Sequence, residues 1–269
     1  MGRGINPNGR SRSGTLKNHW LEKASLYMPD QIFEHPRLVE IYDIFDGSRH
    51  DLDHYCDIVA EFSAKSVLDI GSGTGCFTCR LAALGHLVIG LEPSQVSLDF
   101  ARSKPHADRV HWVLGDVLSL NSPPVDMAFM TGNVAQVFLS DTEWADSLRA
   151  IHRTLRPDGH LVFEVRDPAK EAWRNWTKDK THQIHDIPKI GIVEGWCELQ
   201  RVCGELVTFV WSYLFHSDAA LITSESTLRF RDREAIVRSL NVAGFSIQDI
   251  RDAPDRPAQE FVFIARRSG

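Results

Sequence analysis

A buried strand that runs directly into a glycine-rich turn constrains the fold of this chain more than any other feature. The segment Val67-Leu68-Asp69-Ile70 is followed at once by Gly71-Ser72-Gly73-Thr74-Gly75. Glycine lets the backbone turn sharply and approach a ligand without a Cβ clash, and the spacing over 77–83 predicts a helix after the turn. A strand, a tight turn and a helix in this order predict an α/β fold with a ligand site at the strand end.

Strands and helices alternate through most of the chain. The predicted strands are 66–70, 87–91, 110–114, 126–130, 161–165, 245–250 and 260–265, and the predicted helices that follow the glycine turn are 77–83, 94–103, 143–155 and 232–243. This alternation predicts a parallel sheet with helices on both faces. A helical pattern also precedes the first strand, from Trp20 to Phe62, and is divided by a turn at 46–48.

The rhythm changes after the strand at 161–165. Three longer alternating runs, 192–199, 205–215 and 220–230, follow one another without helices between them. They predict an antiparallel β insert within residues 171–227, which would act as a substrate lid or as a contact in a homodimer. His182 and His185 precede these runs and are expected on a surface loop.

Composition limits the classes of partner. The chain has 30 Lys and Arg against 36 Asp and Glu, a net charge of −6, which disfavours nucleic acid. No apolar run reaches the ~18 residues of a membrane helix, and no signal-peptide core is found at the start. Five cysteines favour a reducing cytoplasm. Residues 1–18, rich in Gly, Ser, Asn and Arg, are expected to form a flexible tail; the alternative is a segment that orders over a ligand.

Three carboxylates follow the first three predicted strands. Asp69 ends the first strand, Glu92 the second, and Asp116 comes just after the third. An acid in the position of Glu92 can accept hydrogen bonds from both hydroxyls of a ribose. Three acids around one crevice would repel a pyrophosphate, whereas they suit a neutral nucleoside that carries ammonium and sulfonium charges. S-adenosylmethionine therefore fits better than a nicotinamide dinucleotide.

With these residues the sequence resembles the class I S-adenosylmethionine-dependent methyltransferases, in particular their bacterial small-molecule subgroup. The matching segments are Val67 to Gly75, Glu92, Gly115-Asp116, Val125 to Ala128, and Leu155 to Leu161. The resemblance implies a Rossmann-like, seven-stranded, mostly parallel sheet whose last strand is antiparallel. It further implies a helical N-terminal lid over 19–62, a cofactor-binding domain over 63–170 and 228–269, and S-adenosylhomocysteine as the product.

Cofactor-binding residues are expected at the strand ends and in the lid. The set is Tyr42, Arg49, Asp69, Gly71, Ser72, Gly73, Glu92, Pro93, Gly115, Asp116, Val117, Thr131, Gly132 and Asn133. Asp116 has a second reading as a cap of the next turn, and Asn133 as an ordinary turn residue. The segment Met130 to Ala135 lacks the Pro-Pro-aromatic sequence of enzymes that methylate nucleobase amines, which also disfavours nucleic acid.

Candidates for catalysis and for acceptor binding are less sharply marked. Tyr42, His50 and His54 are expected at the mouth of the site, where a neutral imidazole can take a proton; the alternatives are packing for the tyrosine and a solvated helix start for the histidines. No metal is expected, because His50 and His54 lack a third ligand and Cys76 and Cys79 lack a second pair. The acceptor-binding candidates are Asn133, Arg166, Trp173, Trp196 and Trp211, with packing of the insert and an ion pair of Arg166 with Glu164 as alternatives.

The sequence thus predicts in-line transfer of a methyl group from S-adenosylmethionine to N or O of a small-molecule acceptor. The alternatives are a protein or RNA methyltransferase, a non-catalytic S-adenosylmethionine-binding module and a nicotinamide-dependent oxidoreductase. Neither a nucleic acid nor a membrane is expected as a partner.

Overall fold

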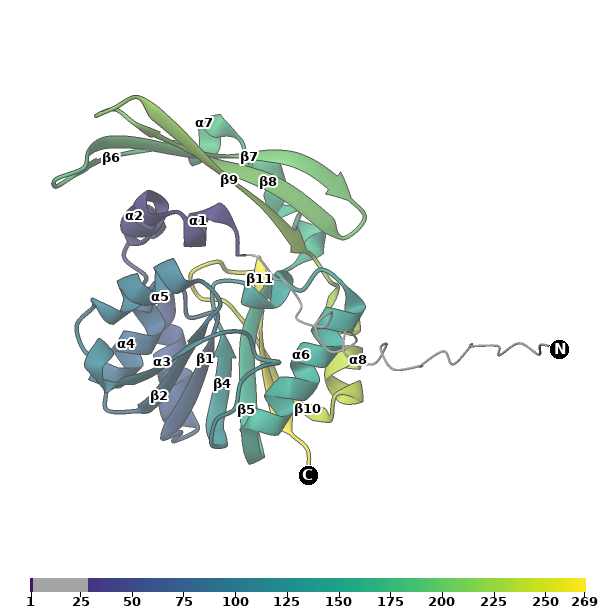
Figure 1. Cartoon of the computed structure of the whole chain (residues 1–269). Helices are drawn as coiled ribbons and strands as arrows, with labels where there is room; N and C mark the ends of the chain where they lie inside the picture. The colour runs from purple at the N-terminus through teal and green to yellow at the C-terminus, as the bar shows by residue number, and fades with distance from the viewer. Residues whose placement is uncertain (2–28) are drawn as a thin grey trace.

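Seven strands form the central sheet of the computed structural model, which describes residue 1 and residues 29–269 (Figure 1). Their order is β10-β11-β5-β4-β1-β2-β3. Their bounds are β1 (Ser66–Ile70), β2 (Leu87–Glu92), β3 (Val110–Leu114), β4 (Val125–Met130), β5 (Leu155–Arg166), β10 (Phe245–Asp252) and β11 (Glu260–Arg267). The pairs from β3 to β5 are parallel, and β11 is antiparallel to both β5 and β10. The predicted Rossmann-like, seven-stranded, mostly parallel sheet is confirmed.

Helices cover both faces of this sheet. Helices α3 (Asp51–Glu61) and α4 (Cys76–Ala83) pack on one face, and α6 (Asp141–Thr154) and α8 (Arg233–Val242) pack on the other. Alternate residues of β1 serve the two layers, since Val67 belongs to the first core and Leu68 to the second. Helix α5 (Gln95–Arg102) contacts β2 and β3.

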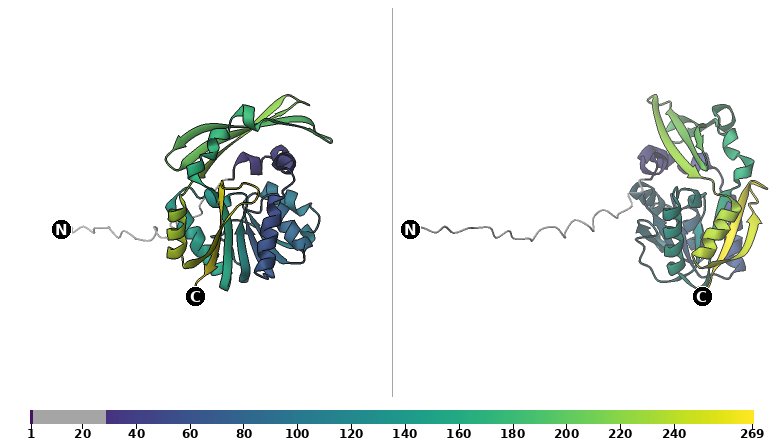
Figure 2. Two further views of the ribbon diagram at one scale, coloured as in Figure 1. Left: turned by 180° about the vertical axis from the view of Figure 1, so that it is seen from behind. Right: turned by 90° about the vertical axis from the view of Figure 1, so that its right-hand side faces the viewer.

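A second sheet lies over the edge of the first sheet where the parallel strands end (Figures 1 and 2). It is antiparallel and consists of β6 (Gln183–Ile187), β7 (Gly191–Cys203), β8 (Leu206–Phe215) and β9 (Ala220–Arg229). Helix α7 (Lys178–Thr181) packs on β7. The expectation of a surface loop at His182 and His185 is wrong for His185, which belongs to β6 and pairs with Val193.

Helices α1 (Gln31–Glu34) and α2 (Pro36–Asp46) lie between the two sheets (Figure 1). The amide of Ile32 donates to Ser224 Oγ in β9 at 2.9 Å. The carbonyl of Phe33 accepts from Ser94 Oγ at 2.6 Å and from Ser97 Oγ at 2.7 Å, at the start of α5. One short helix is therefore hydrogen-bonded to both layers, which fixes the height of the second sheet above the first.

The remaining differences from the sequence prediction are local. The predicted strand 161–165 begins earlier, at Leu155, and contains a bulge, because Val125 pairs with Leu155 while Met127 pairs with His160. Four 3-10 turns supply connections at η1 (Ala107–Arg109), η2 (Val134–Gln136), η3 (Pro168–Lys170) and η4 (Ala172–Asn175). Apart from Met1, the predicted tail over 1–18 and the lid residues 19–28 lie outside the described residues. None of the described helices is both long and apolar enough to cross a membrane.

Candidate cofactor and acceptor site

A cavity of about 300 Å³ lies at the ends of the parallel strands, beneath the second sheet. Its walls come from the glycine turn, the ends of β2, β4 and β5, helices α1 and α2, and the inner face of β8 and β9. The predicted residues that line it are Tyr42, Gly71, Gly73, Glu92, Pro93, Gly115, Asp116, Val117, Gly132, Asn133 and Arg166. The fold thus brings together residues predicted for the cofactor and residues predicted for the acceptor in one space.

The glycine turn needs glycine for two reasons. Gly71 has a φ of +69°, and a Cβ at this position would lie 2.8 Å from Val134 Cγ2. Gly73 has a φ of +53° but has free space around it. The amide groups of Gly71 and Ser72 both donate to the carbonyl of Leu91, at 2.8 and 3.0 Å. This ties the turn to the end of β2 and brings it close to Glu92.

Glu92 is a buried carboxylate at the centre of the cavity wall. It is 4% exposed, and its two oxygens accept from the amides of Gly73 at 2.8 Å and Ser94 at 2.9 Å. Burial raises its pKa to about 7, although these amide donors act in the opposite direction. Since each oxygen retains a second lone pair, the carboxylate can still accept hydrogen bonds from ligand hydroxyls.

Asp116 caps a turn and also lines the cavity, while its contact with the cofactor stays a prediction. Its Oδ1 accepts from the amides of Leu118 at 3.0 Å and Ser119 at 2.9 Å, so it caps the turn after β3. The same residue lines the cavity. The hydrogen bonds hold the carboxylate in one orientation, which leaves Oδ2 to meet an exocyclic amine.

Asn133 is held by a carboxylate that the sequence analysis did not select for this role. Asn133 has a φ of +64°, and its backbone N–H donates to Glu164 Oε1 at 2.9 Å. Tyr55 donates its hydroxyl to the other oxygen of Glu164, whose pKa burial raises to about 7. Asn133 Oδ1 is buried and has no hydrogen-bond partner among the described residues. An orphaned acceptor beside the cavity is suited to a ligand donor such as an ammonium group.

Asp69 lies beneath the glycine turn and is not one of the described residues that line the cavity. It is 1% exposed, and Thr78 donates to its Oδ2 at 2.5 Å while Oδ1 has no described partner. Burial raises its pKa to about 6. Its contact with the cofactor stays a prediction, and its position favours orientation of the turn.

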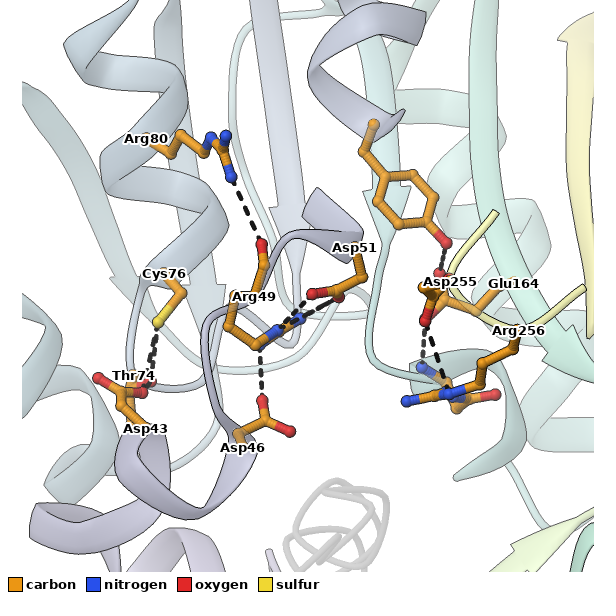
Figure 3. Close-up of polar contacts among 12 residues, drawn as sticks. Asp43, Asp46, Arg49, Asp51, Thr74, Cys76, Arg80, Glu164, Asp255 and Arg256 are labelled. Atoms are coloured by element: carbon orange, nitrogen blue, oxygen red, sulfur yellow. Dashed lines mark hydrogen bonds and ion pairs between the residues drawn. The ribbon is translucent and has the colours of Figure 1, made fainter. Parts of the chain in front are cut away.

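The lid helix contributes Tyr42 directly and Arg49 indirectly. Tyr42 lines the cavity, and burial strongly raises the pKa of its hydroxyl. Figure 3 shows Arg49 between Asp46 and Asp51, with ion-pair distances of 2.8 and 2.9 Å. These two carboxylates occupy the guanidinium, and Arg49 lies outside the cavity lining.

The residue after Tyr42 fastens the lid to the glycine turn (Figure 3). Asp43 Oδ1 accepts from Thr74 Oγ1 at 2.5 Å and from Cys76 Sγ at 3.3 Å, and Oδ2 forms an ion pair with Lys104. Cys76 is therefore half-buried and polar in its contacts, whereas Cys79 is buried. This Asp43 cluster holds Tyr42 over the cavity.

Other predicted residues lie away from the cavity lining. His50 is exposed, and His54 packs edge-on against Tyr55. Trp173 packs on Phe230, Trp196 lies under Lys178 and Trp211 stacks on Tyr213, which matches the packing alternative. The remaining predicted residues outside the lining are Ser72 and Thr131. Ligand contact by all of these stays a prediction.

The part of the cavity beneath the second sheet is lined by residues that the sequence analysis did not select. Trp176 and Phe209 line it and pack against each other with ring centroids 4.5 Å apart. Phe209 and Leu228 face inward from β8 and β9. Period-two alternation marks such positions, but it does not reveal which face of the insert meets the cofactor site.

Comparison with known proteins identifies a domain within the chain. Residues 67–159 match the family model of a methyltransferase domain. The matched segment contains the glycine turn, Glu92, Asp116 and Asn133.

Two curated relatives match parts of the chain, and the second is a methyltransferase by name. The chain is 32% identical over 120 residues to the biotin biosynthesis bifunctional protein BioHC of Cellvibrio japonicus, a match that covers 43% of this chain and 23% of that protein. It is 27% identical over 194 residues to the malonyl-[acyl-carrier protein] O-methyltransferase of Yersinia pestis, which covers 70% of each. The chain thus spans less than a quarter of the first relative and about two thirds of the second.

Solved structures share the fold over nearly the whole chain. An S-adenosylmethionine-dependent methyltransferase from Clostridium acetobutylicum ATCC 824 superposes with a TM-score of 0.70 at 17% identity, covering 87% of this chain and 98% of the other. The sugar N-methyltransferase KedS8 from Streptoalloteichus sp ATCC 53650 gives 0.66 at 17% identity, covering 100% and 99%. At these identities the likeness is one of fold.

Proposed function

The chain belongs to the class I S-adenosylmethionine-dependent methyltransferases, and on that premise we propose that it transfers a methyl group from S-adenosylmethionine to a nitrogen or oxygen atom of a small-molecule metabolite. The observation that carries the proposal is the position of Glu92. A buried carboxylate lies beside a glycine turn in the wall of a cavity that continues into an apolar compartment under the second sheet.

The residues present fit the cofactor in charge and in hydrogen bonding. Glu92 and Asp116 offer acceptors to a ribose and an adenine amine, and neither suits a diphosphate because both are anionic. The orphaned Asn133 Oδ1 offers an acceptor to an ammonium group. Gly71 and Gly73 present backbone without a Cβ where a ligand approaches.

Methyl transfer requires the protein mainly to align the acceptor with the methyl donor and to exclude water. When bound, the sulfonium supplies an activated methyl group. The chain must hold the acceptor atom in line with the methyl carbon and the sulfur, and alignment of this kind supplies ~7–11 kcal/mol in favourable systems. Apolar walls from Phe33, Phe138 and Val137 keep water away from the reaction.

Three side chains are candidates for a general base. Tyr42 reaches the cavity, but burial raises its pKa and keeps the hydroxyl neutral. His50 and His54 stay predictions for this role. An amine acceptor needs little help with deprotonation, and a general base would add ~10²–10⁴-fold.

The second sheet is proposed as the lid of the acceptor compartment. Phe209, Ser226 and Leu228 of β8 and β9 line the cavity, and Trp176 reaches it from the segment before β6. The name of the superposed sugar N-methyltransferase supports a small acceptor. The homodimer stays a prediction.

Isothermal titration of the purified chain with S-adenosylhomocysteine tests the cofactor site. We expect binding by the wild type, none with NAD, and a loss of about 100-fold or more in Glu92→Ala, because two charge-assisted hydrogen bonds disappear. Asp126→Asn is the matched control, since this carboxylate accepts from Ser66 and Lys65 at the opposite edge of the sheet. Equal affinities in the Glu92 variant and the wild type would defeat the assignment. Mass spectrometry of acceptor mixtures with labelled S-adenosylmethionine then tests transfer.

A further inference from the structure

A single basic side chain stands out in the described lining of the cavity, which is otherwise acidic and apolar. This lining contains four acids, Asp30, Glu92, Asp116 and Glu143, of which Glu92 ends β2 and Asp116 follows β3. The same lining contains one basic side chain among the described residues, Arg166 at the end of β5. In the sheet order β5-β4-β1-β2, Arg166 therefore lies on the far side of the glycine turn from Glu92.

Arg166 is only partly neutralised by the protein. Its Nε lies 3.4 Å from Glu260 Oε1, and its side chain is 21% exposed. The same Glu260 oxygen accepts from Arg256 Nη1 at 2.7 Å, so one carboxylate serves two guanidinium groups. No described residue accepts a hydrogen bond from the two terminal nitrogens of Arg166. Burial lowers the pKa of Arg166, as expected for a cation that lacks full compensation.

An apolar wall accompanies this cation. The guanidinium carbon lies 5.7 Å from the ring centre of Trp176, and Trp176 packs on Phe209. A ligand that reaches Arg166 must pass between aromatic and aliphatic surfaces, because Leu228 and Phe138 also line the cavity. The compartment thus suits an apolar body that ends in an anionic group.

We propose that Arg166 binds a carboxylate of the methyl acceptor, so that the substrate class is a carboxylic acid with an apolar or aromatic body. The inference rests on the proposed function, since it concerns the acceptor half of that site. The carboxylate acts as an anchor, because an oxygen held by charge-assisted hydrogen bonds from a guanidinium is a poor nucleophile. The methyl group then goes to a nitrogen or hydroxyl oxygen elsewhere on the acceptor.

The charge arrangement explains why an anion is preferred over a neutral group. A guanidinium with unused donors in a secluded cavity gains most from a ligand that supplies both charge and acceptors. A carboxylate matches two parallel N–H groups, whereas a carboxamide supplies one acceptor oxygen and no charge. We expect ~10–100-fold tighter binding of an acid than of its amide.

Binding of simple probes to the protein saturated with S-adenosylhomocysteine tests the proposal. The probes are 3-phenylpropionate and 3-phenylpropanamide, which differ only in the anionic group, and their dissociation constants are measured by ligand-observed NMR. We expect the acid to bind better than the amide in the wild type and equally weakly in Arg166→Met, with Arg166→Lys in between. Arg37→Met is the matched control, because Arg37 stacks on Phe215 and pairs with Asp218 away from the cavity.

Three results would overturn the proposal. The first is equal binding of the two probes, or no binding of the acid up to its solubility limit. The second is an unchanged preference for the acid in Arg166→Met. The third is a fall in S-adenosylhomocysteine affinity in Arg166→Met, which would assign the guanidinium to the cofactor carboxylate. Failure of the wild type to bind S-adenosylhomocysteine counts against the proposed function instead, and it is measured separately before the probes are added.

Discussion

The affinity for S-adenosylhomocysteine is expected to depend on pH through Glu92. In the free protein, burial raises the pKa of this carboxyl to about 7, and the nearby acids Asp69 and Glu34 act in the same direction. Ribose hydroxyls donate hydrogen bonds and therefore favour the ionised carboxylate. Binding should release a proton below about pH 7 and should become tighter as the pH rises.

The size of the effect follows from the ionised fraction. A group with a pKa of about 7 is ~9% ionised at pH 6 and ~91% ionised at pH 8. If only the ionised form binds tightly, the association constant rises ~10-fold over this interval, which corresponds to ~1.4 kcal/mol. The stability of the ligand-free protein changes with pH in the opposite direction, because the pKa of Glu92 in the folded state is above its unfolded value of 4.5. The ligand-free protein should lose stability as the pH rises from this value through about 7.

Calorimetric titration at several pH values and in two buffers of different ionisation enthalpy measures both the affinity and the proton release. Glu92→Gln should bind weakly and without this pH dependence. A flat profile in the wild type, or the same slope in Glu92→Gln, would refute the assignment of Glu92.

Two further predictions concern the glycine turn and the lid. Gly71→Ala should lower the thermal midpoint of the ligand-free protein more than Gly73→Ala. Both positions have positive φ, so each variant loses ~1–2 kcal/mol of stability from the backbone alone, but only the Cβ at position 71 meets a valine methyl, at 2.8 Å. Equal shifts of the midpoint would contradict the packing argument. Asp43→Asn should weaken S-adenosylhomocysteine binding by ~3–10-fold through loss of the ion pair with Lys104, whereas Asp99→Asn, which removes only an exposed pair, should not; calorimetry that shows no difference between them would remove the Asp43 cluster from the site.

The cofactor half of the site is predictable from the sequence because its signals are local. Gly71 and Asp116 follow strands and Glu92 ends one, and the carboxyl ends of parallel strands meet at one edge of a sheet. The strand β1 is found with its observed bounds, since both of its faces are buried and three of its five residues are large and apolar.

The acceptor half is not predictable in the same way. The acceptor half depends on where the second sheet lies above the central sheet. Helix α1 holds the second sheet in place through contacts such as Ile32 to Ser224, and this brings together Trp176, Phe209 and Leu228. These contacts join residues that are far apart in sequence, and composition carries no signal for them. Trp173 and Trp196 illustrate the difficulty, because the same residue type in the same segment packs on other parts of the insert.

The net charge of −6 illustrates why whole-chain composition says little about the acceptor. It disfavours nucleic acid, yet it averages over a cavity in which the sign of the charge reverses between Glu92 and Arg166. Screening is limited inside a secluded cavity, so each charged side chain acts mainly on the part of the ligand nearest to it. Glu92 and Asp116, which favour a cationic methyl donor, and Arg166, which favours an anionic acceptor, would orient the two reactants toward each other, and the methyl transfer point would lie between them near Asn133.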